Sequence, residues 1–196
     1  MIAAVLALSL AWGGSRPARA CGPAPYAACA DSRQLLASKD FQASLKRFAG
    51  NAQAAYSQRD RSIAKEVAER LAAPAGPSED LGRGVRLFAG CRTNACPEKA
   101  AVMLDRSGVL AIGVLAYHSE SNPMLEVIAQ RSGPQTAARA AILRSWAAKA
   151  VADDAARLHV PLVLQGVKIR ALREDVATAI PVKTCSRIQT LIHRCR

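Results

Sequence analysis

Two segments near the start of the chain carry apolar residues every three or four positions, which is the spacing of one face of an α-helix. The first predicts a short helix capped by Asp40. The second predicts a helix over residues 60–73, ended by the Pro- and Gly-containing residues 74–77, with Glu66 and Arg70 on its outer face. The apolar positions are Phe41, Leu45 and Phe48 in the first segment, and Ile63, Val67 and Leu71 in the second.

From residue 85 onward the pattern changes to short β-prone runs. Residues 85–88 alternate as a strand does, and residues 100–104 and 109–117 form two further runs. The turn-forming residues 105–108 between these two runs predict a β-hairpin. Gly113 in the second run marks either a bulge or a close packing contact.

The strongest helical pattern is Ala-rich and covers residues 134–158, with proline in the first turn. Its apolar stripe is expected to place Trp146 in the core. Residues 161–170 predict a last strand interrupted at Gly166, whereas residues 124–130 fit either a strand or a helical turn. The predicted stripe consists of Ala138, Ile142, Leu143, Trp146, Ala150 and Val151. Together the elements predict an α+β fold: an antiparallel β-sheet with N-terminal helices and a long C-terminal Ala-rich helix.

The start of the chain resembles a secretory signal peptide. The apolar run of residues 2–12 is too short to cross a bilayer, and a small-x-small sequence ends at Ala20, where we expect cleavage. Lipidation of Cys21 is an alternative, because this cysteine directly follows the cut. The predicted organisation is a signal peptide over residues 1–20, a cysteine-containing segment over 21–37, a single α+β domain over 38–180 and a basic cysteine-containing tail over 181–196.

The chain is strongly basic. Its formal net charge is +12, and loss of the signal peptide lowers this to about +10. Such an excess attracts polyanions, among which we consider anionic lipid, acidic cell-wall polymer or an acidic protein face, while nucleic acid is not expected. The alternative is an Arg-rich surface that is solvated and has no partner.

All six cysteines follow the predicted cleavage site, and an even number behind an export signal is typical of disulfide bonds. They fall into three local couples, so local pairing is the simplest arrangement. A staple between the two ends of the chain is the alternative, and loop-entropy models assign longer closures more stabilisation. The couples are Cys21 with Cys29, Cys91 with Cys96, and Cys185 with Cys195.

The spacing of Cys91 and Cys96 bears on three other kinds of chemistry. Structural zinc usually needs two close ligand pairs, and this pair is wider than a zinc knuckle. A redox pair would have two intervening residues instead of four, and a catalytic thiol would need a histidine close by. We therefore expect no metal and no cofactor. What remains is a closed six-residue loop that suits insertion into a partner's cleft, or a stapled strand connection with no partner.

An enzyme would have to use the nearest polar constellation, Asp105, His118 and Glu120. No nucleophile motif, phosphate loop or metal spacing frames these residues. We therefore expect the chain not to be an enzyme.

Residues 85–117 resemble the inhibitor of vertebrate lysozyme (Ivy) family. The matching features are Cys91 and Cys96 at the family spacing, the basic Arg92, Lys99 before the following strand, and Ala101, Val102 and Met103 within it. The resemblance implies an exported bacterial protein with N-terminal helices, an antiparallel sheet and a disulfide-closed loop that enters a lysozyme active site. It implies a partner-binding loop made of Cys91, Arg92, Thr93, Asn94, Ala95 and Cys96.

The loop departs from the family at its centre. The family sequence Cys-Lys-Pro-His-Asp-Cys carries a histidine where this chain has Asn94, with Thr93 and Ala95 on either side. Asparagine can donate hydrogen bonds but cannot become an imidazolium, which leaves Arg92 as the positive group for a carboxylate-lined cleft. We predict a periplasmic or secreted binding protein that engages a lysozyme-like or other cell-wall enzyme through this loop. The alternative is a basic envelope module that binds anionic polymer or lipid without inhibiting an enzyme.

Overall fold

A computed structural model describes residues 21, 26–54, 56, 60–74, 76–117 and 123–173. The predicted signal peptide over residues 1–20 and the tail over residues 181–196, with Cys185 and Cys195, lie outside these described residues. The helical elements are η1 (Tyr26–Ala28), α1 (Ser32–Ala37), α2 (Lys39–Ala49), α3 (Ile63–Arg70) and α4 (Pro134–Leu158). The strands are β1 (Gln53–Ala54), β2 (Arg61–Ser62), β3 (Ala73–Pro74), β4 (Glu79–Asp80), β5 (Arg86–Arg92), β6 (Ala95–Asp105), β7 (Gly108–Tyr117), β8 (Pro123–Ala129) and β9 (Gly166–Ala171).

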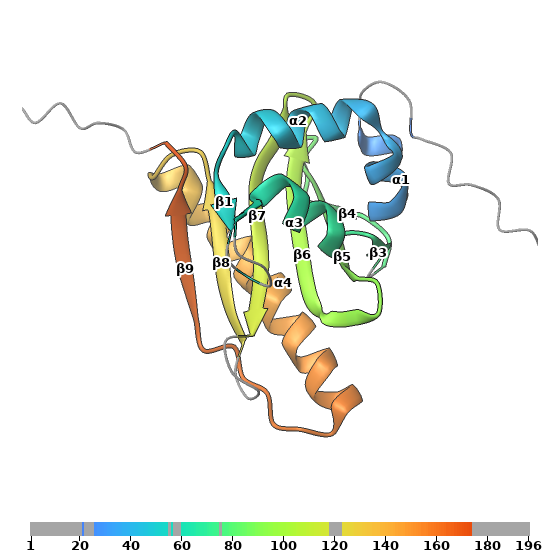
Figure 1. Cartoon of the computed structure of the whole chain (residues 1–196), viewed down its shortest axis with the longest axis vertical. Helices are drawn as coiled ribbons and strands as arrows, with labels where there is room; N and C mark the ends of the chain where they lie inside the picture. The colour runs from blue at the N-terminus through green and yellow to red at the C-terminus, as the bar shows by residue number, and fades with distance from the viewer. Residues whose placement is uncertain are drawn as a thin grey trace, which may run out of the picture.

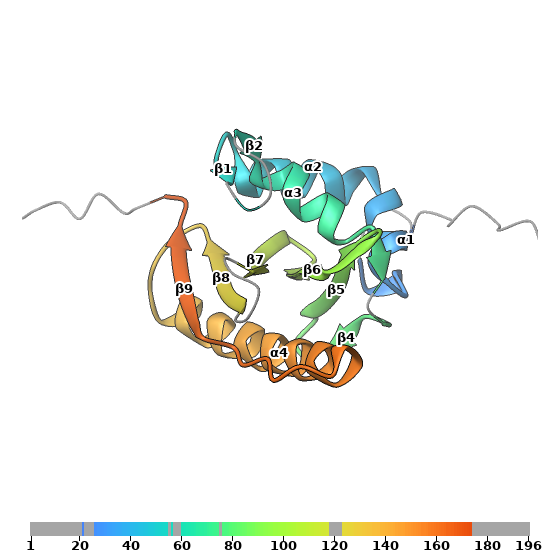
Figure 2. The ribbon, with the colours of Figure 1, turned by 60° about the horizontal axis from the view of Figure 1, so that its bottom comes forward.

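One sheet organises the molecule, with the strand order β3-β5-β6-β7-β8-β9 and β4 paired to β5 (Figure 1). The long strands are apolar on both faces, because successive side chains of a strand point to opposite sides and both sides are covered. Along β6, Val102 and Leu104 enter a core beneath α1, α2 and α3, whereas Ala101 and Met103 enter a second core beneath α4. Figure 2 shows these helices on the two sides of the sheet.

The predicted α+β class is confirmed, with a correction at one edge of the sheet. All neighbouring strands are antiparallel except β8 and β9, which pair in parallel. A parallel pair needs a crossover connection, and α4 supplies it. The hairpin predicted at residues 105–108 is confirmed by the pairing of Asp105 with Gly108, and residues 124–130 fall largely in strand β8.

Two helix starts differ from the prediction, because Ser38 and Ser62 cap the helices. The Ser38 hydroxyl accepts the Phe41 N–H at 3.3 Å, so Asp40 lies within the first turn of α2. Ser62 caps α3 in the same way, so this helix begins at Ile63, three residues after the predicted start. The preceding Asp60 has a φ of 62°, which is incompatible with a right-handed helix.

The bounds predicted for α4 are confirmed, but its buried stripe lies on a partly different set of residues from the one predicted. Ala138 and Ile142 are exposed, because only one row of side chains spaced three or four residues apart meets the sheet. Trp146 packs against this core, as expected. Gly113 marks a close contact, since a Cβ there would lie 3.1 Å from Leu143. The buried row is Thr136, Ala140, Leu143, Ala147, Ala150, Val151 and Asp154. Within the described part of the chain, no helix is long and apolar enough to cross a membrane.

Two of the expected disulfides are present, and both are local. Cys21 bonds to Cys29, and Cys91 bonds to Cys96, with Cα–Cα distances of 5.2 and 4.8 Å. Cys29 is buried in the same core as Leu35 of α1, so that core includes side chains from before residue 38.

Candidate partner-binding site at the end of the β5–β6 hairpin

The end of the β5–β6 hairpin is a two-residue turn closed by a disulfide. The strands pair regularly as far as Cys91 and Lys99, after which the register shifts and Arg92 pairs with Ala95. The extra residues 96–98 bulge from β6, and Thr93 and Asn94 form the turn. Asn94 has a φ of 65°, a left-handed conformation that asparagine adopts more readily than most residues.

The six residues of the predicted loop differ in exposure. Thr93, Asn94 and Cys96 are exposed, Arg92 and Ala95 are partly buried, and Cys91 is buried. The turn therefore presents two neutral, hydrogen-bonding side chains, while its base is anchored in the sheet.

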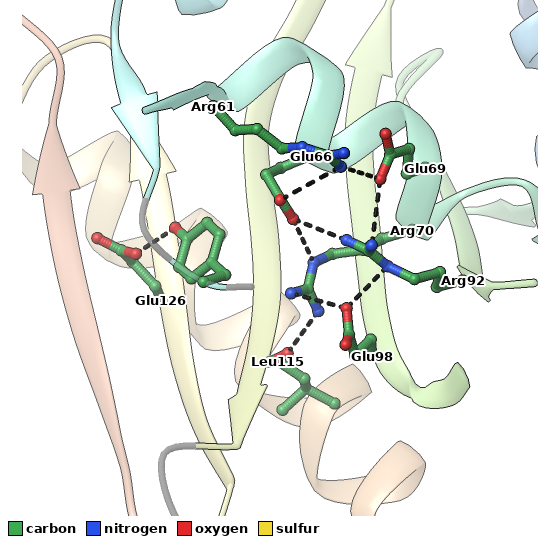
Figure 3. A network of polar contacts seen from close by, with 9 residues as sticks. Arg61, Glu66, Glu69, Arg70, Arg92, Glu98, Leu115 and Glu126 are labelled. Atoms are coloured by element: carbon green, nitrogen blue, oxygen red, sulfur yellow. Dashed lines mark hydrogen bonds and ion pairs between the residues drawn. The ribbon is translucent and has the colours of Figure 1, made fainter. Parts of the chain in front are cut away.

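Arg92 is held inside the chain by three ion pairs (Figure 3). Its guanidinium group lies 3.0 Å from Glu66, 3.2 Å from Glu69 and 2.8 Å from Glu98. Glu66 and Glu69 belong to α3, and Glu98 lies in the β6 bulge. The hairpin end is thus tied to a helix as well as closed by a disulfide.

The outer position predicted for Glu66 and Arg70 is wrong: both side chains are buried, at 0% and 2% exposure. Arg70 lies 3.3 Å from Glu66 and 3.2 Å from Glu98, and it donates to the Leu115 carbonyl at 3.2 Å (Figure 3). Arg61 also pairs with Glu66 and Glu69. We call Arg61, Glu66, Glu69, Arg70, Arg92 and Glu98 the Arg–Glu network. Its three positive and three negative groups cancel in formal charge.

A partly buried tyrosine adjoins this network. The Arg70 guanidinium lies 5.4 Å from the centre of the Tyr56 ring, a cation–π distance. The Tyr56 hydroxyl donates to Glu126 of β8, and burial together with that carboxylate raises the pKa of Tyr56. Through Tyr56, polar contacts therefore continue from the Arg–Glu network across the sheet to β8.

The sequence contains one indication that Glu66 and Arg70 are buried, although the apolar periodicity of the helix did not reveal it. A helix buried along a stripe uses positions i, i+3, i+4, i+7 and i+8, and from Ile63 these positions include Glu66 and Arg70. Charged residues within such a stripe indicate a buried ion pair when their partners come from another element. Arg92 and Glu98 supply those partners, and only the tertiary structure brings them to α3.

A second polar cluster fixes the other side of the hairpin. Lys99 of β6 lies 2.5 Å from Asp154 of α4 and donates to the Cys96 carbonyl at 2.8 Å. Tyr117 and Arg157 also donate to Asp154. Burial by itself would raise the pKa of Asp154, but the hydrogen bonds from Lys99 and Arg157 outweigh it and hold that pKa below its usual value. Burial and the Asp154 carboxylate raise the pKa of Tyr117 to about 12.

Asp154→Asn is expected to reduce the free energy of unfolding by about 2 kcal/mol at neutral pH, because it leaves the Lys99 ammonium without its counter-charge. The folded-state pKa of Asp154 is depressed, so this contribution is present above about pH 4 and is lost as the pH falls through the lower, folded-state value. Urea unfolding at several pH values should show the difference between wild type and variant narrowing below about pH 4. Asp153→Asn, at the exposed neighbouring position, is the control and should show no such pH-dependent difference.

Of the polar constellation considered for an enzyme, Asp105 is the one residue that the structure describes. Asp105 lies at the turn end of the β6–β7 hairpin, where it accepts the N–H and O–H of Ser107. His118 and Glu120 lie outside the described residues. Among the side chains that the structure describes, no three His, Cys, Asp or Glu residues are placed to hold a metal ion.

Comparison with known proteins adds no relative. No protein-family model, no curated protein and no solved structure matches this chain.

Proposed function

We propose that this chain is an exported binding protein that presents the Thr93–Asn94 turn to a cell-wall-active enzyme. The observation that carries the proposal is the contrast at the hairpin end: the turn is exposed, while the residues on both sides of it are fixed. The disulfide closes the hairpin end, the Arg–Glu network joins it to α3, and the Lys99–Asp154 pair joins it to α4.

Such fixing favours binding because a rigid turn loses little conformational freedom when a partner covers it. The Cys91–Cys96 bond restricts the six-residue loop, and Lys99 holds the Cys96 carbonyl in place. A structural connection with no partner would not require that both faces of the hairpin be anchored around an exposed, polar tip.

The chemistry of the tip indicates recognition by neutral hydrogen bonds. Arg92 shares its charge with three carboxylates of its own chain, so we assign the principal contact to Asn94 rather than to Arg92. The Asn94 amide both donates and accepts, and its N–H groups suit the carboxylates that line a glycan-cleaving active site. The resemblance to the Ivy family supports this class of partner. The excess positive charge favours an enzyme with an acidic surface over basic lysozymes.

Asn94→Gly is expected to weaken the complex at least about tenfold, because glycine keeps the left-handed backbone and removes only the amide side chain. The measurement is inhibition and binding of a panel of c-type and g-type lysozymes and bacterial lytic enzymes. Arg106→Ala alters an exposed residue in the opposite β6–β7 turn and should bind as wild type does.

Two results would reject the proposal. One is a panel of enzymes that stays fully active and unbound in the presence of the wild-type protein. The other is capture of an envelope protein that is equally strong with the Cys91→Ser/Cys96→Ser variant, since binding would then not depend on the closed turn.

A further inference from the structure

A cavity at the far end of the sheet collects three arginines from three distant parts of the chain. Arg47 comes from α2, Arg139 from α4 and Arg173 from the residues after β9. The cavity measures about 440 Å³, and Ser107 and Gln130 also line it. This volume is in the range of small-molecule sites, and none of the described residues that line it is acidic.

The guanidinium group of Arg139 is positioned by neutral groups. It donates to the Leu110 carbonyl at 3.2 Å and to the Gln135 side-chain oxygen at 3.4 Å. Leu110 is the extra residue at the β7 bulge, since Leu104 pairs with Val109 and Met103 with Ala111. The bulge points the Leu110 carbonyl at Arg139, and this neutral acceptor orients the guanidinium group without neutralising its charge.

The other two arginines are not paired with a carboxylate of the described residues either. Arg47 and Arg173 are exposed, and within the described residues neither side chain forms an ion pair or a hydrogen bond. The nearby Asp105 carboxylate accepts two hydrogen bonds from Ser107. Three like charges around one hollow repel one another, and a multivalent anion would relieve that repulsion.

The start of α4 adds to the positive potential. The helix is 25 residues long, and its N-cap Gly133 offers no side chain to the first turn. The partial positive charge of this helix end therefore lies close to Arg139, in the second turn. The helix dipole and the guanidinium groups therefore both favour an anion in this cavity.

We infer that this cavity binds a phosphate group. A phosphate monoester carries close to two negative charges at neutral pH and several acceptor oxygens, which matches convergent arginines better than a single carboxylate does. The cavity is larger than a phosphate, so the group is expected to belong to a bigger molecule, either a soluble phosphorylated compound or a lipid headgroup. The site lies roughly 30 Å from the Thr93–Asn94 turn, the length of the 11-residue strand β6, and is independent of the proposed partner loop.

The test is isothermal titration calorimetry of the full chain with inorganic pyrophosphate at low salt. Arg139→Gln and Arg47→Gln should each weaken binding about tenfold or more. Lys46→Gln removes the same charge from the neighbouring exposed position on α2, outside the cavity, and should change affinity less than about twofold. Thermal melts check that the variants fold. Arg173→Gln repeats the test at a side chain that forms no hydrogen bond or ion pair with the described residues.

Two outcomes would overturn the inference: no pyrophosphate binding by the wild type, or equal weakening by Lys46→Gln and Arg47→Gln, which would indicate a diffuse basic surface. Sedimentation with phosphatidylcholine vesicles, with and without phosphatidic acid, separates the two phosphate sources. Retention on the acidic vesicles that Arg47→Gln abolishes assigns a lipid headgroup, whereas pyrophosphate binding without retention assigns a soluble ligand. Asn94→Gly should leave all of these results unchanged.

Discussion

Replacing Glu66 with alanine is expected to lower the free energy of unfolding by about 3–5 kcal/mol, because it removes the carboxylate that three arginines share. Arg70 is 2% exposed and would keep a buried charge with one fewer partner. The measurement is urea or thermal unfolding, and we expect a fall in Tm of roughly 10 °C for a chain of this size.

The control for Glu66→Ala is Lys65→Ala on the exposed side of the same helix, which should leave stability close to that of wild type. Glu66→Gln keeps the shape and one acceptor and should fall between wild type and alanine. If Glu66→Ala is as stable as Lys65→Ala, the carboxylate is not buried in an ion network. Loss of Glu66 also removes one of the three ion pairs that hold Arg92 beside the turn, so the variant should bind a partner of the turn more weakly even where it remains folded.

Gly90→Ala is expected to destabilise the protein by about 3 kcal/mol or to prevent folding. A Cβ on Gly90 would lie 2.7 Å from the Leu71 Cα and 2.9 Å from the carbonyl oxygens of Leu71 and Ala73. These are backbone atoms and cannot rotate away, so the end of α3 and strand β3 would have to move off β5. Unfolding in urea measures the effect.

Gly166→Ala is the matched control for Gly90→Ala. Its added Cβ meets nothing within 4 Å and its backbone has an ordinary φ, so its stability should stay within about 0.5 kcal/mol of wild type. Equal stability of the two variants would contradict the close approach of α3 to β5. Both Glu66 and Gly90 act on this contact, which places the Arg–Glu network over the hairpin end.

Local chemistry was enough to predict much of the fold. The β6–β7 hairpin follows from the turn formers at residues 105–108, and α4 follows from a proline at its start and a long Ala-rich periodicity. The helix starts were misplaced by a few residues, because Ser38 rather than Asp40 caps α2 and Ser62 caps α3 after the predicted start at residue 60. The strand predicted over residues 161–170 begins only at Gly166, the first residue of β9, and residues 161–165 lie outside the sheet.

The sequence by itself determined the α+β class, the β6–β7 hairpin and the long helix α4, and it favoured local pairing of Cys91 with Cys96, because each depends on residues close together in the chain. Only the tertiary structure decided that Glu66 and Arg70 are buried beside Arg92, and that Lys99 meets Asp154. It also brought Arg47, Arg139 and Arg173 to one cavity. The physical reason is that the burial of a charge depends on partners from distant segments, and periodicity along one element carries no record of them.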